Sequence, residues 1–292
     1  MFTMSTTSQL PADIAALLDD FIDRAIYEDV REGDHTSQAC IPPGMRNKAQ
    51  LKIKDVGVIA GVEVARRIFE KVDPSSTFEL LIPDGTEVNY GDIAFKVECN
   101  TQALLKAERV ALNTMQRMSG IATLSNHFAF EVEDLPVKIL DTRKTTPLIR
   151  FLEKWAVRLG GCHNYRVGLY DWIMIKDNHI DACGGITQAI NRVQEYQHSK
   201  GLQLGVTIEV RNLVELAEVL EAGRITRIMF DNFELPLLQE AVATVDKRFE
   251  TEASGGVTIH NVRRVAQTGV DYISVGALTH SATSLDMSLK VV

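Results

Sequence analysis

The sequence predicts an α/β protein with two parts, and two patterns support this prediction. Between Lys48 and Cys99 apolar and polar residues alternate, which is typical of half-buried antiparallel strands. From Val137 onward short apolar runs alternate with helical segments, which predicts a parallel sheet, either open or closed into a barrel. We expect residues 1–119 to form the first domain and residues 120–292 the second. It stays open whether the last residues return to the first domain.

Composition and charge exclude several classes of protein. The chain has 292 residues, of which 45% are hydrophobic and 24% charged, as in ordinary globular proteins. Its net charge of −8 gives it no electrostatic reason to coat nucleic acid or an anionic membrane. No apolar run approaches the roughly 18 residues that span a bilayer. Met1–Gln9 lack the features of a signal peptide, and the 4 cysteines are scattered, so we expect reduced thiols in a cytoplasmic protein.

The first part begins with a helix whose apolar residues recur every three or four positions from Ile14 to Ala25. Strands are expected around Leu51 and from Ile93 to Val97, and a long helix over Thr101–Met118. Arg109 lies within the second apolar stripe of that helix. A buried arginine needs an anionic partner, and the spacing leaves a structural acid and a ligand equally open.

The second part contains the repeated strand–helix pattern. Its predicted strands are Val137–Leu140, Trp172–Ile175, Val206–Val210, Arg227–Phe230, Phe249–Ala253 and Tyr272–Val275. Predicted helices include Pro147–Leu159, Leu213–Ala222 and Thr258–Thr268, with Thr146 and Thr258 as expected N-caps.

Charged residues and glycines follow these strands. The strand ends read Asp141-Thr142-Arg143-Lys144, Lys176-Asp177, Glu209, Asp231-Asn232, Ser254-Gly255-Gly256 and Gly276-Ala277. Ligands bind at the carboxyl edge of parallel sheets, so this series predicts one site. The two glycine turns favour phosphate, since glycine lets backbone N–H groups approach an anion. The alternative is that they are ordinary turns.

The side chains at this edge indicate a ligand with several anionic groups. Arg143, Lys144, Arg166 and Lys176 are candidate carboxylate and phosphate contacts. Glu209 and Asp231 suit sugar hydroxyls or waters on Mg²⁺, and a salt bridge to a neighbouring strand-end lysine is the alternative for either carboxylate. His163, His179 and His280 have no ligand spacing, and no serine or cysteine motif indicates a covalent nucleophile.

Long ordered motifs in this chain resemble those of the quinolinate phosphoribosyltransferase family. They are Glu28-Asp29, Gly33-Asp34, Thr36-Ser37, Glu108-Arg109, Leu112-Asn113, Gln116-Arg117, Ser119-Gly120-Ile121-Ala122-Thr123, Asp141 to Pro147, Lys176-Asp177-Asn178-His179 and Val275 to Ser281. The resemblance implies the type II phosphoribosyltransferase fold, an N-terminal α/β sandwich joined to an incomplete βα barrel. It also implies a homodimer in which one subunit's N-terminal domain covers the partner's barrel mouth, and it leaves higher oligomers open.

The resemblance implies an enzyme of NAD biosynthesis, nicotinate-nucleotide diphosphorylase (carboxylating), a glycosyltransferase of the pentosyltransferase class. Phosphoribose would pass from 5-phosphoribosyl pyrophosphate to quinolinate in the presence of Mg²⁺, giving nicotinate mononucleotide, pyrophosphate and CO₂. The implied quinolinate contacts are Arg109 (across the subunit interface), Arg143, Tyr165, Arg166 and Lys176. The implied phosphoribosyl pyrophosphate contacts are Lys144, Glu209, Asp231, Ser254, Gly255, Gly256, Gly276 and Ala277. Lys144, Lys176, Glu209 and Asp231 would be catalytic, with Mg²⁺ near the two acids.

Two positions depart from the family pattern. The usual Asn-His-Arg reads Asn164-Tyr165-Arg166, which puts a neutral phenol in the substrate pocket. The glycine that commonly follows Thr-Thr-Pro is Leu148, which we place on a buried helix face. Two other functions remain as alternatives: a related transferase with another carboxylated acceptor, and a non-catalytic sensor of phosphoribosyl compounds.

Overall fold

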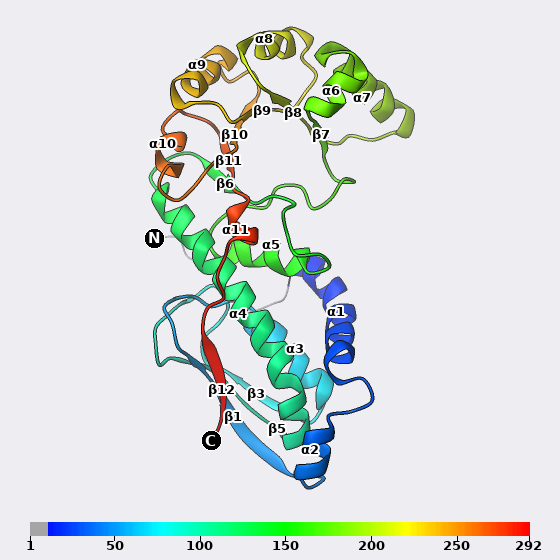
Figure 1. The fold of residues 1–292 in the computed structure, drawn as a ribbon, viewed down its shortest axis with the longest axis vertical. Helices are drawn as coiled ribbons and strands as arrows, with labels where there is room; N and C mark the ends of the chain where they lie inside the picture. Colours follow the sequence, from blue (N-terminus) through cyan, green and yellow to red (C-terminus); the bar gives the residue numbers. More distant parts are fainter. Residues whose placement is uncertain (1–10) are drawn as a thin grey trace. The chain divides into compact units, whose positions relative to one another are not determined.

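A computed structural model describes residues 11–292 of the chain. The segment Met1–Gln9, for which the sequence predicts no signal peptide, lies outside the described residues. The chain forms two compact units that interleave in sequence (Figure 1). Unit 1 comprises Met1–Asn126, Thr145–Gly161 and Ser281–Val292, and unit 2 comprises His127–Lys144 and Cys162–His280. This division differs from the single boundary predicted between residues 119 and 120. The reason is that helix α4 (Thr101–Glu131) runs unbroken through that position.

Unit 1 is built on an antiparallel sheet. Its strand order is β12 (Met287–Val291), β1 (Arg46–Ile53), β5 (Ile93–Asn100) and β3 (Thr77–Leu80). A separate two-stranded sheet joins β2 (Gly57–Val58) to β4 (Glu87–Val88). The alternation of apolar residues predicted around Leu51 and from Ile93 to Val97 therefore marks real strands. The pairing of β12 with β1 brings the end of the chain back to this unit.

Unit 1 also contains the helices α1 (Ala12–Val30), α2 (His35–Cys40) and α3 (Val62–Val72), most of α4, and α5 (Arg150–Leu159). Helix α3 packs on the sheet, whereas α1 and α5 contact each other. The Phe69 ring of α3 lies 6.1 Å from the Phe95 ring of β5 in an edge-on contact, and both side chains are fully buried. A Cβ at Gly61, which precedes α3, would lie 3.3 Å from the Met115 backbone of α4, so the two helices approach closely there (Figure 1).

Helix α5 begins later than the sequence predicts. Thr146 is not its N-cap, because Glu153 takes both the Thr146 N–H (3.0 Å) and the Thr146 hydroxyl (2.8 Å). Pro147 and Leu148 form a turn, and the helix starts at Arg150. Leu148 is 83% exposed with φ +70°, so its predicted place on a buried helix face is wrong. This backbone conformation favours glycine, the residue common at this position in the family.

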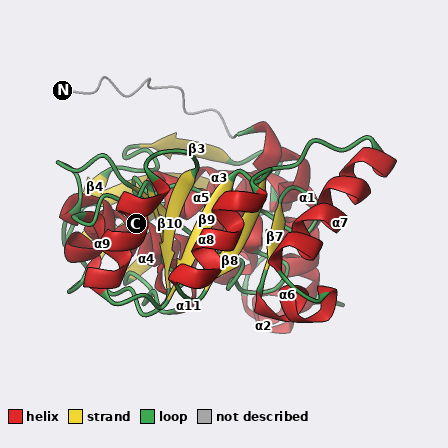
Figure 2. Ribbon diagram, turned by 90° about the horizontal axis from the view of Figure 1, so that it is seen from above, coloured by secondary structure: helices red, strands yellow, loops and turns green. Residues whose placement is uncertain are grey.

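Unit 2 contains the parallel sheet. Its order is β6 (Lys138–Leu140), β11 (Tyr272–Ser274), β10 (Glu250–Ser254), β9 (Arg227–Asp231), β8 (Val206–Val210) and β7 (Ile173–Ile175). Helices α6 (Asp177–Cys183), α7 (Ile186–Lys200), α8 (Leu213–Ala222), α9 (Leu235–Val245) and α10 (Val262–Ala266) lie on the outside of the curved sheet, as Figures 1 and 2 show. The short α11 (Ala277–His280) follows β11. The six strands have β6 and β7 as their two edges, so the described residues form an incomplete barrel.

The helix predicted to begin at Thr258 begins later. Thr258 does not cap it, since the Thr258 N–H donates to Asn261 (2.7 Å) and α10 begins only at Val262.

The helices described in both units include none that is both long and apolar enough to cross a membrane.

Candidate active site

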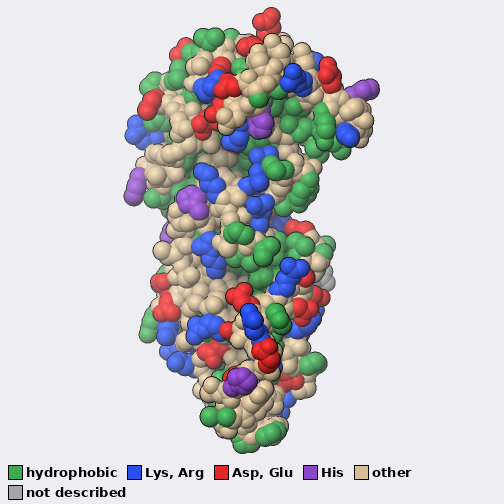
Figure 3. Space-filling view, turned by 45° about the vertical axis from the view of Figure 1, so that its right-hand side comes forward, with side chains coloured by type: hydrophobic (Ala, Val, Ile, Leu, Met, Phe, Trp, Pro, Cys, Tyr) green, Lys and Arg blue, Asp and Glu red, His purple; other side chains and the backbone are tan. Residues whose placement is uncertain are grey.

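A pocket of about 750 Å³ lies in unit 2 at the carboxyl ends of the parallel strands. It is lined by all the predicted site residues of that unit: Arg143, Lys144, Tyr165, Arg166, Lys176, Glu209, Asp231, Ser254, Gly255, Gly256, Gly276 and Ala277. Thr142 and Asn232, which belong to the predicted series of strand ends, also line it, as do residues that the sequence did not indicate, among them Met174, Met229, Ser274 and His280. In the upper half of the view in Figure 3, Lys and Arg side chains gather at a recess in the surface.

One wall of the pocket is glycine backbone. Gly255 and Gly256 have φ values of +92° and +61°, and a Cβ at Gly255 would lie 2.2 Å from Asn232 Oδ1. Asn232 itself has φ +56° and donates its N–H to the Ser254 carbonyl (2.8 Å). At Gly276 a Cβ would lie 3.0 Å from the Lys144 side chain. The first turn therefore requires glycine, and at Gly276 a side chain would crowd Lys144 and His280. Both turns present backbone to an anionic ligand.

The acidic wall carries the two predicted carboxylates. Glu209, at the end of β8, binds the Lys176 ammonium (Oε2 to Nζ, 2.9 Å), so the salt bridge left open by the sequence is present in this structure. Asp231, at the end of β9, accepts a hydrogen bond from the Asn232 amide (2.8 Å). Two carboxylates on neighbouring strands suit Mg²⁺, which is usually held by one or two carboxylates together with substrate phosphates. Among residues 11–292 no group of three His, Cys, Asp or Glu could hold a metal ion on its own.

The cationic end of the pocket contains Arg143 and Arg166. Partial burial and the neighbouring positive charge of Arg143 hold the pKa of Arg166 below its ordinary value. The Arg166 guanidinium donates to the Trp172 carbonyl (3.3 Å) and contacts the Met174 sulfur (3.4 Å). Two cations close together repel each other, so a dianionic ligand between them relieves that repulsion.

Asp141 positions this end of the pocket and was missed as a functional residue. It is fully buried at the end of β6 and accepts from the Asn164 amide (2.6 Å) and the Tyr165 N–H (2.8 Å). It thereby fixes the segment that carries Tyr165 and Arg166. The available signal was its place as the first charged residue after an apolar strand. Similarly, His179 accepts the Lys176 N–H (2.9 Å) and fixes the turn after β7.

The Tyr165 hydroxyl points into the barrel interior, where it is hydrogen-bonded. It lies 2.6 Å from the Thr207 hydroxyl, and its hydrogen bond helps to hold down the pKa of Glu252, which burial raises. Burial raises the pKa of Tyr165 itself, so the phenol is neutral at physiological pH. The residue lines the pocket with its hydroxyl already paired, so its contribution there is the shape of the ring.

Arg109 lies elsewhere, in unit 1. On α4 its side chain is exposed, and the adjacent Leu105 is 39% exposed, whereas Leu112 is buried. The prediction of a buried arginine in a second apolar stripe is therefore wrong for the single chain. Exposure of a leucine and an arginine on one helix face leaves this face available for contact with another molecule.

Comparisons with known proteins identify relatives of both parts of the chain. Residues 34–119 match the family "Quinolinate phosphoribosyl transferase, N-terminal domain", and residues 121–290 match its C-terminal domain. A Nicotiana tabacum protein named quinolinate phosphoribosyltransferase (decarboxylating) 1b is 47% identical in an alignment of 285 positions, which covers 92% of this chain and 81% of that protein. An Arabidopsis thaliana protein named nicotinate-nucleotide pyrophosphorylase (carboxylating), chloroplastic, is 48% identical in an alignment of 282 positions, which covers 91% of this chain and 80% of that protein.

Solved structures agree with these sequence matches. The crystal structure of NadC from Streptococcus pyogenes has a TM-score of 0.90 and 36% identity to this chain, and the match covers 98% of this chain and 100% of that one. The nicotinate-nucleotide pyrophosphorylase of Francisella tularensis has a TM-score of 0.89 at 31% identity, over 99% and 100% of the two chains. The similarity thus extends over both units.

Proposed function

The chain belongs to the quinolinate phosphoribosyltransferase family, and from this premise we propose the reaction that its pocket carries out. The protein is a nicotinate-nucleotide pyrophosphorylase (carboxylating), a pentosyltransferase of NAD biosynthesis. It transfers phosphoribose from 5-phosphoribosyl pyrophosphate to the nitrogen of quinolinate. Pyrophosphate leaves, and loss of the 2-carboxylate as CO₂ gives nicotinate mononucleotide.

The acceptor is assigned to the cationic end of the pocket. Quinolinate carries two carboxylates on adjacent ring carbons, and Arg143, Arg166 and Lys176 line this pocket as exposed or half-buried cations. A guanidinium binds a carboxylate through two parallel hydrogen bonds, which orients the ring as well as holding it. This orientation matters because the ring nitrogen must face the reacting carbon of the ribose.

The donor is assigned to the glycine walls and the acidic wall. The backbone at Gly255, Gly256 and Gly276 would receive the 5-phosphate, and Lys144, which lies against Gly276, would contact the pyrophosphate. Glu209 and Asp231 are assigned to the ribose hydroxyls and to Mg²⁺, which would neutralise charge on the departing pyrophosphate.

The transition state of glycosyl transfer has positive charge on the sugar ring, as in an oxocarbenium ion. Fixed carboxylates beside the ring stabilise that charge without reorganising. The Lys176 ammonium, 2.9 Å from Glu209 Oε2, holds that carboxylate in a fixed position. Breaking the bond to the 2-carboxylate would then release CO₂ and leave an electron pair at ring carbon 2. The adjacent positive ring nitrogen stabilises this pair until a proton from water forms the C–H bond of the product.

We further propose a homodimer in which Arg109 reaches the partner's pocket. The exposed side chains of Arg109 and Leu105 on α4 support a contact with another chain. Mixing inactive Arg109→Ala and Lys144→Ala proteins should restore part of the activity, because one pocket of each mixed dimer is then intact. Subunit exchange without recovered activity would contradict the shared site.

The cytoplasm remains the proposed location, supported by the free state of all the cysteines, Cys40, Cys99, Cys162 and Cys183. Relatives named mitochondrial and chloroplastic exist in plants, so fractionation of the source cells is the direct test.

A single observation carries the assignment of the site: one pocket brings cations, carboxylates and glycine backbone together. The test is purified protein with quinolinate, 5-phosphoribosyl pyrophosphate and Mg²⁺, following nicotinate mononucleotide and CO₂. Nicotinate in place of quinolinate is the control for a monocarboxylate acceptor. Turnover of nicotinate at an equal rate, or tight binding of both substrates without turnover, would contradict the proposal.

A further inference from the structure

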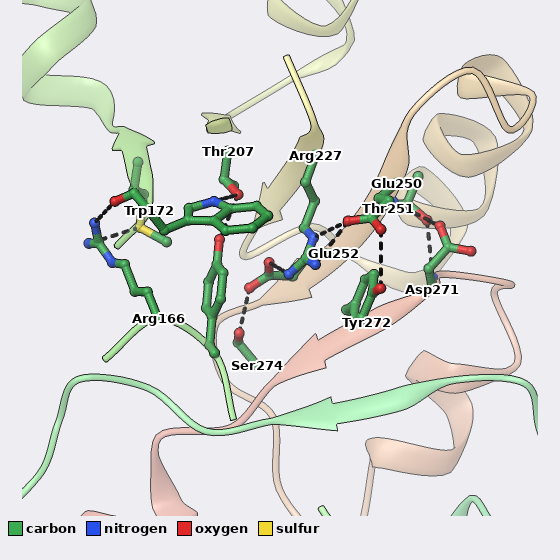
Figure 4. A network of polar contacts seen from close by, with 12 residues as sticks. Arg166, Trp172, Thr207, Arg227, Glu250, Thr251, Glu252, Asp271, Tyr272 and Ser274 are labelled. Atoms are coloured by element: carbon green, nitrogen blue, oxygen red, sulfur yellow. Dashed lines mark hydrogen bonds and ion pairs between the residues drawn. The ribbon is translucent and has the colours of Figure 1, made fainter. Parts of the chain in front are cut away.

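An ion pair lies inside the barrel of unit 2. Arg227, only 6% exposed, donates to Glu250 (2.9 Å) and to Glu252 (3.1 Å), and Glu252 is fully buried (Figure 4). The three residues come from the neighbouring strands β9 and β10, where Glu250 pairs in register with Arg227. Neither Arg227 nor Glu252 lines the pocket.

The buried position of the Arg227–Glu252 ion pair lowers its contribution to the stability of the fold. Interiors of βα barrels are usually filled by Val, Ile and Leu. Desolvation of a buried ion pair offsets much of its attraction, and apolar side chains of similar volume often give a more stable protein. Stability alone therefore does not explain why Arg227 and Glu252 occupy these positions.

The surroundings of the pair supply such a role. Glu252 accepts hydrogen bonds from the hydroxyls of Ser274 and Tyr165, and both of these residues line the pocket. The Arg227 guanidinium carbon lies 3.7 Å from the ring centre of Tyr272 and 5.1 Å from that of Tyr165. A planar cation against aromatic faces restricts the positions that the rings adopt.

The same network extends to an arginine of the pocket. Thr207 contacts the Tyr165 hydroxyl (2.6 Å) and accepts from the Trp172 indole N–H (2.8 Å). The Trp172 carbonyl in turn accepts from Arg166 (3.3 Å). Figure 4 shows Trp172, Thr207, Arg227 and Glu252 converging in the barrel interior.

We propose that Arg227 and Glu252 are positioning residues, which set the shape of the acceptor end of the pocket by holding Tyr165 and Ser274 from below. The inference rests on the proposed function, since it names quinolinate as the ligand whose fit is set. The ring of Tyr165 occupies the position where the family usually has histidine, and the buried pair keeps that ring in one place. Binding of 5-phosphoribosyl pyrophosphate does not depend on this network, because its assigned contacts lie on the glycine and acidic walls.

Two glutamates on the same arginine provide a matched experiment. Glu252→Gln keeps the size of the side chain but weakens its hold on Tyr165, Ser274 and Arg227. We expect the quinolinate KM to rise about ten-fold, while the KM for 5-phosphoribosyl pyrophosphate changes less than two-fold. Glu250→Gln is the control, because Glu250 also binds Arg227 but its side chain is 41% exposed and it contacts neither Tyr165 nor Ser274 in the described network. Both KM values should stay within two-fold in this variant.

A double variant tests whether Glu252 acts through the phenol. In a Tyr165→Phe background, Glu252→Gln should raise the quinolinate KM only about three-fold, because the hydrogen bond between Glu252 and the Tyr165 hydroxyl is already absent. If Glu252→Gln does not fold, Arg227→Lys replaces it, since lysine keeps the charge but not the planar contact with the rings, and the same KM split is expected.

Three outcomes would overturn the proposal. They are an unchanged quinolinate KM in a folded variant, a parallel rise in both KM values, and equal effects of Glu252→Gln and Glu250→Gln. If the wild-type protein does not turn over quinolinate, the proposed function fails instead, and the two failures are thereby distinguished.

Discussion

The two units use paired charges differently. In unit 1, the fully buried Glu153 is satisfied by the chain itself: Arg117 donates to it at 2.8 Å, and Thr146 donates through both its N–H and its hydroxyl. In unit 2, Arg166 hydrogen-bonds a carbonyl oxygen and contacts a sulfur, and its pKa is lowered by burial and by another cation. A charge that the fold satisfies contributes to stability, whereas a cation held near other cations contributes to binding an anion.

The largest effect is expected for Arg166→Ala, which tests whether this charge of unit 2 serves binding rather than stability. Removal of this cation leaves a ligand carboxylate without its partner in a half-buried site, which costs about 3–5 kcal/mol. We expect kcat/KM for quinolinate to fall at least about a hundred-fold, since 1.4 kcal/mol corresponds to a factor of ten. The melting temperature should change little, and thermal unfolding of the same sample checks this. A large loss of stability with retained activity would show that Arg166 serves the fold.

The counterpart in unit 1 is Arg117→Ala. Within residues 11–292 it leaves the buried Glu153 carboxylate paired with Thr146 but without its cation. Breaking such a pair costs about 3 kcal/mol, at the low end because Arg117 is 26% exposed. The free energy of unfolding, measured with denaturant, should fall by about that amount. Arg158→Ala is the control: its pair with Asp13 is exposed, so its loss should cost less than about 1 kcal/mol. Equal effects of the two variants would contradict the distinction between buried and surface pairs.

Tyr165 allows a test by pH. Its phenol stays neutral because burial raises its pKa, so the wild-type quinolinate KM should not titrate through this residue between about pH 5.5 and 8. Tyr165→His introduces a group with an ordinary pKa of about 6.5, which becomes cationic as the pH falls. A cation attracts the dicarboxylate, so the quinolinate KM of the variant should decrease as the pH falls through that range.

Tyr165→Phe serves as the matched variant for this pH experiment. It should raise the quinolinate KM at most a few-fold, because the hydroxyl that is lost is paired with Thr207 inside the barrel while the ring that lines the pocket is kept. Its KM should keep the pH dependence of the wild type. A thousand-fold fall in kcat for folded Tyr165→Phe would instead give the hydroxyl a catalytic role.

The smallest expected effect belongs to Leu148→Gly in unit 1. Leu148 is 83% exposed with φ +70°, so glycine relieves strain at that position but gains entropy in the unfolded chain. We expect a net stabilisation of about 0.5–1 kcal/mol, read from the denaturant midpoint. Leu148→Ala is the control, since alanine loses the side chain but keeps the strain, and it should not stabilise the protein. A destabilised glycine variant would show that the leucine side chain contributes a contact.

The candidate site was predictable because of a rule about sheet edges. Each strand of unit 2 ends in a polar residue or glycine, and parallel strands bring their carboxyl ends to one edge. Arg143, Lys176, Glu209 and Asp231 therefore line one pocket, as the sequence predicted. The exposure of Arg109 was not predictable, because an apolar stripe shows which residues could be buried and not which of them meet a partner within the chain.

The sequence by itself determined the strands, their polar ends and the glycine turns, because period-two alternation and glycine at close approaches are local properties of the chain. The tertiary structure alone decided the pairing of Arg227 with Glu252, the direction of the Tyr165 hydroxyl and the positive φ of Leu148. Those features depend on strand order and register, which place β9 beside β10 and Thr207 opposite Arg227. Such contacts join residues far apart in sequence, and their energies do not appear in any local pattern.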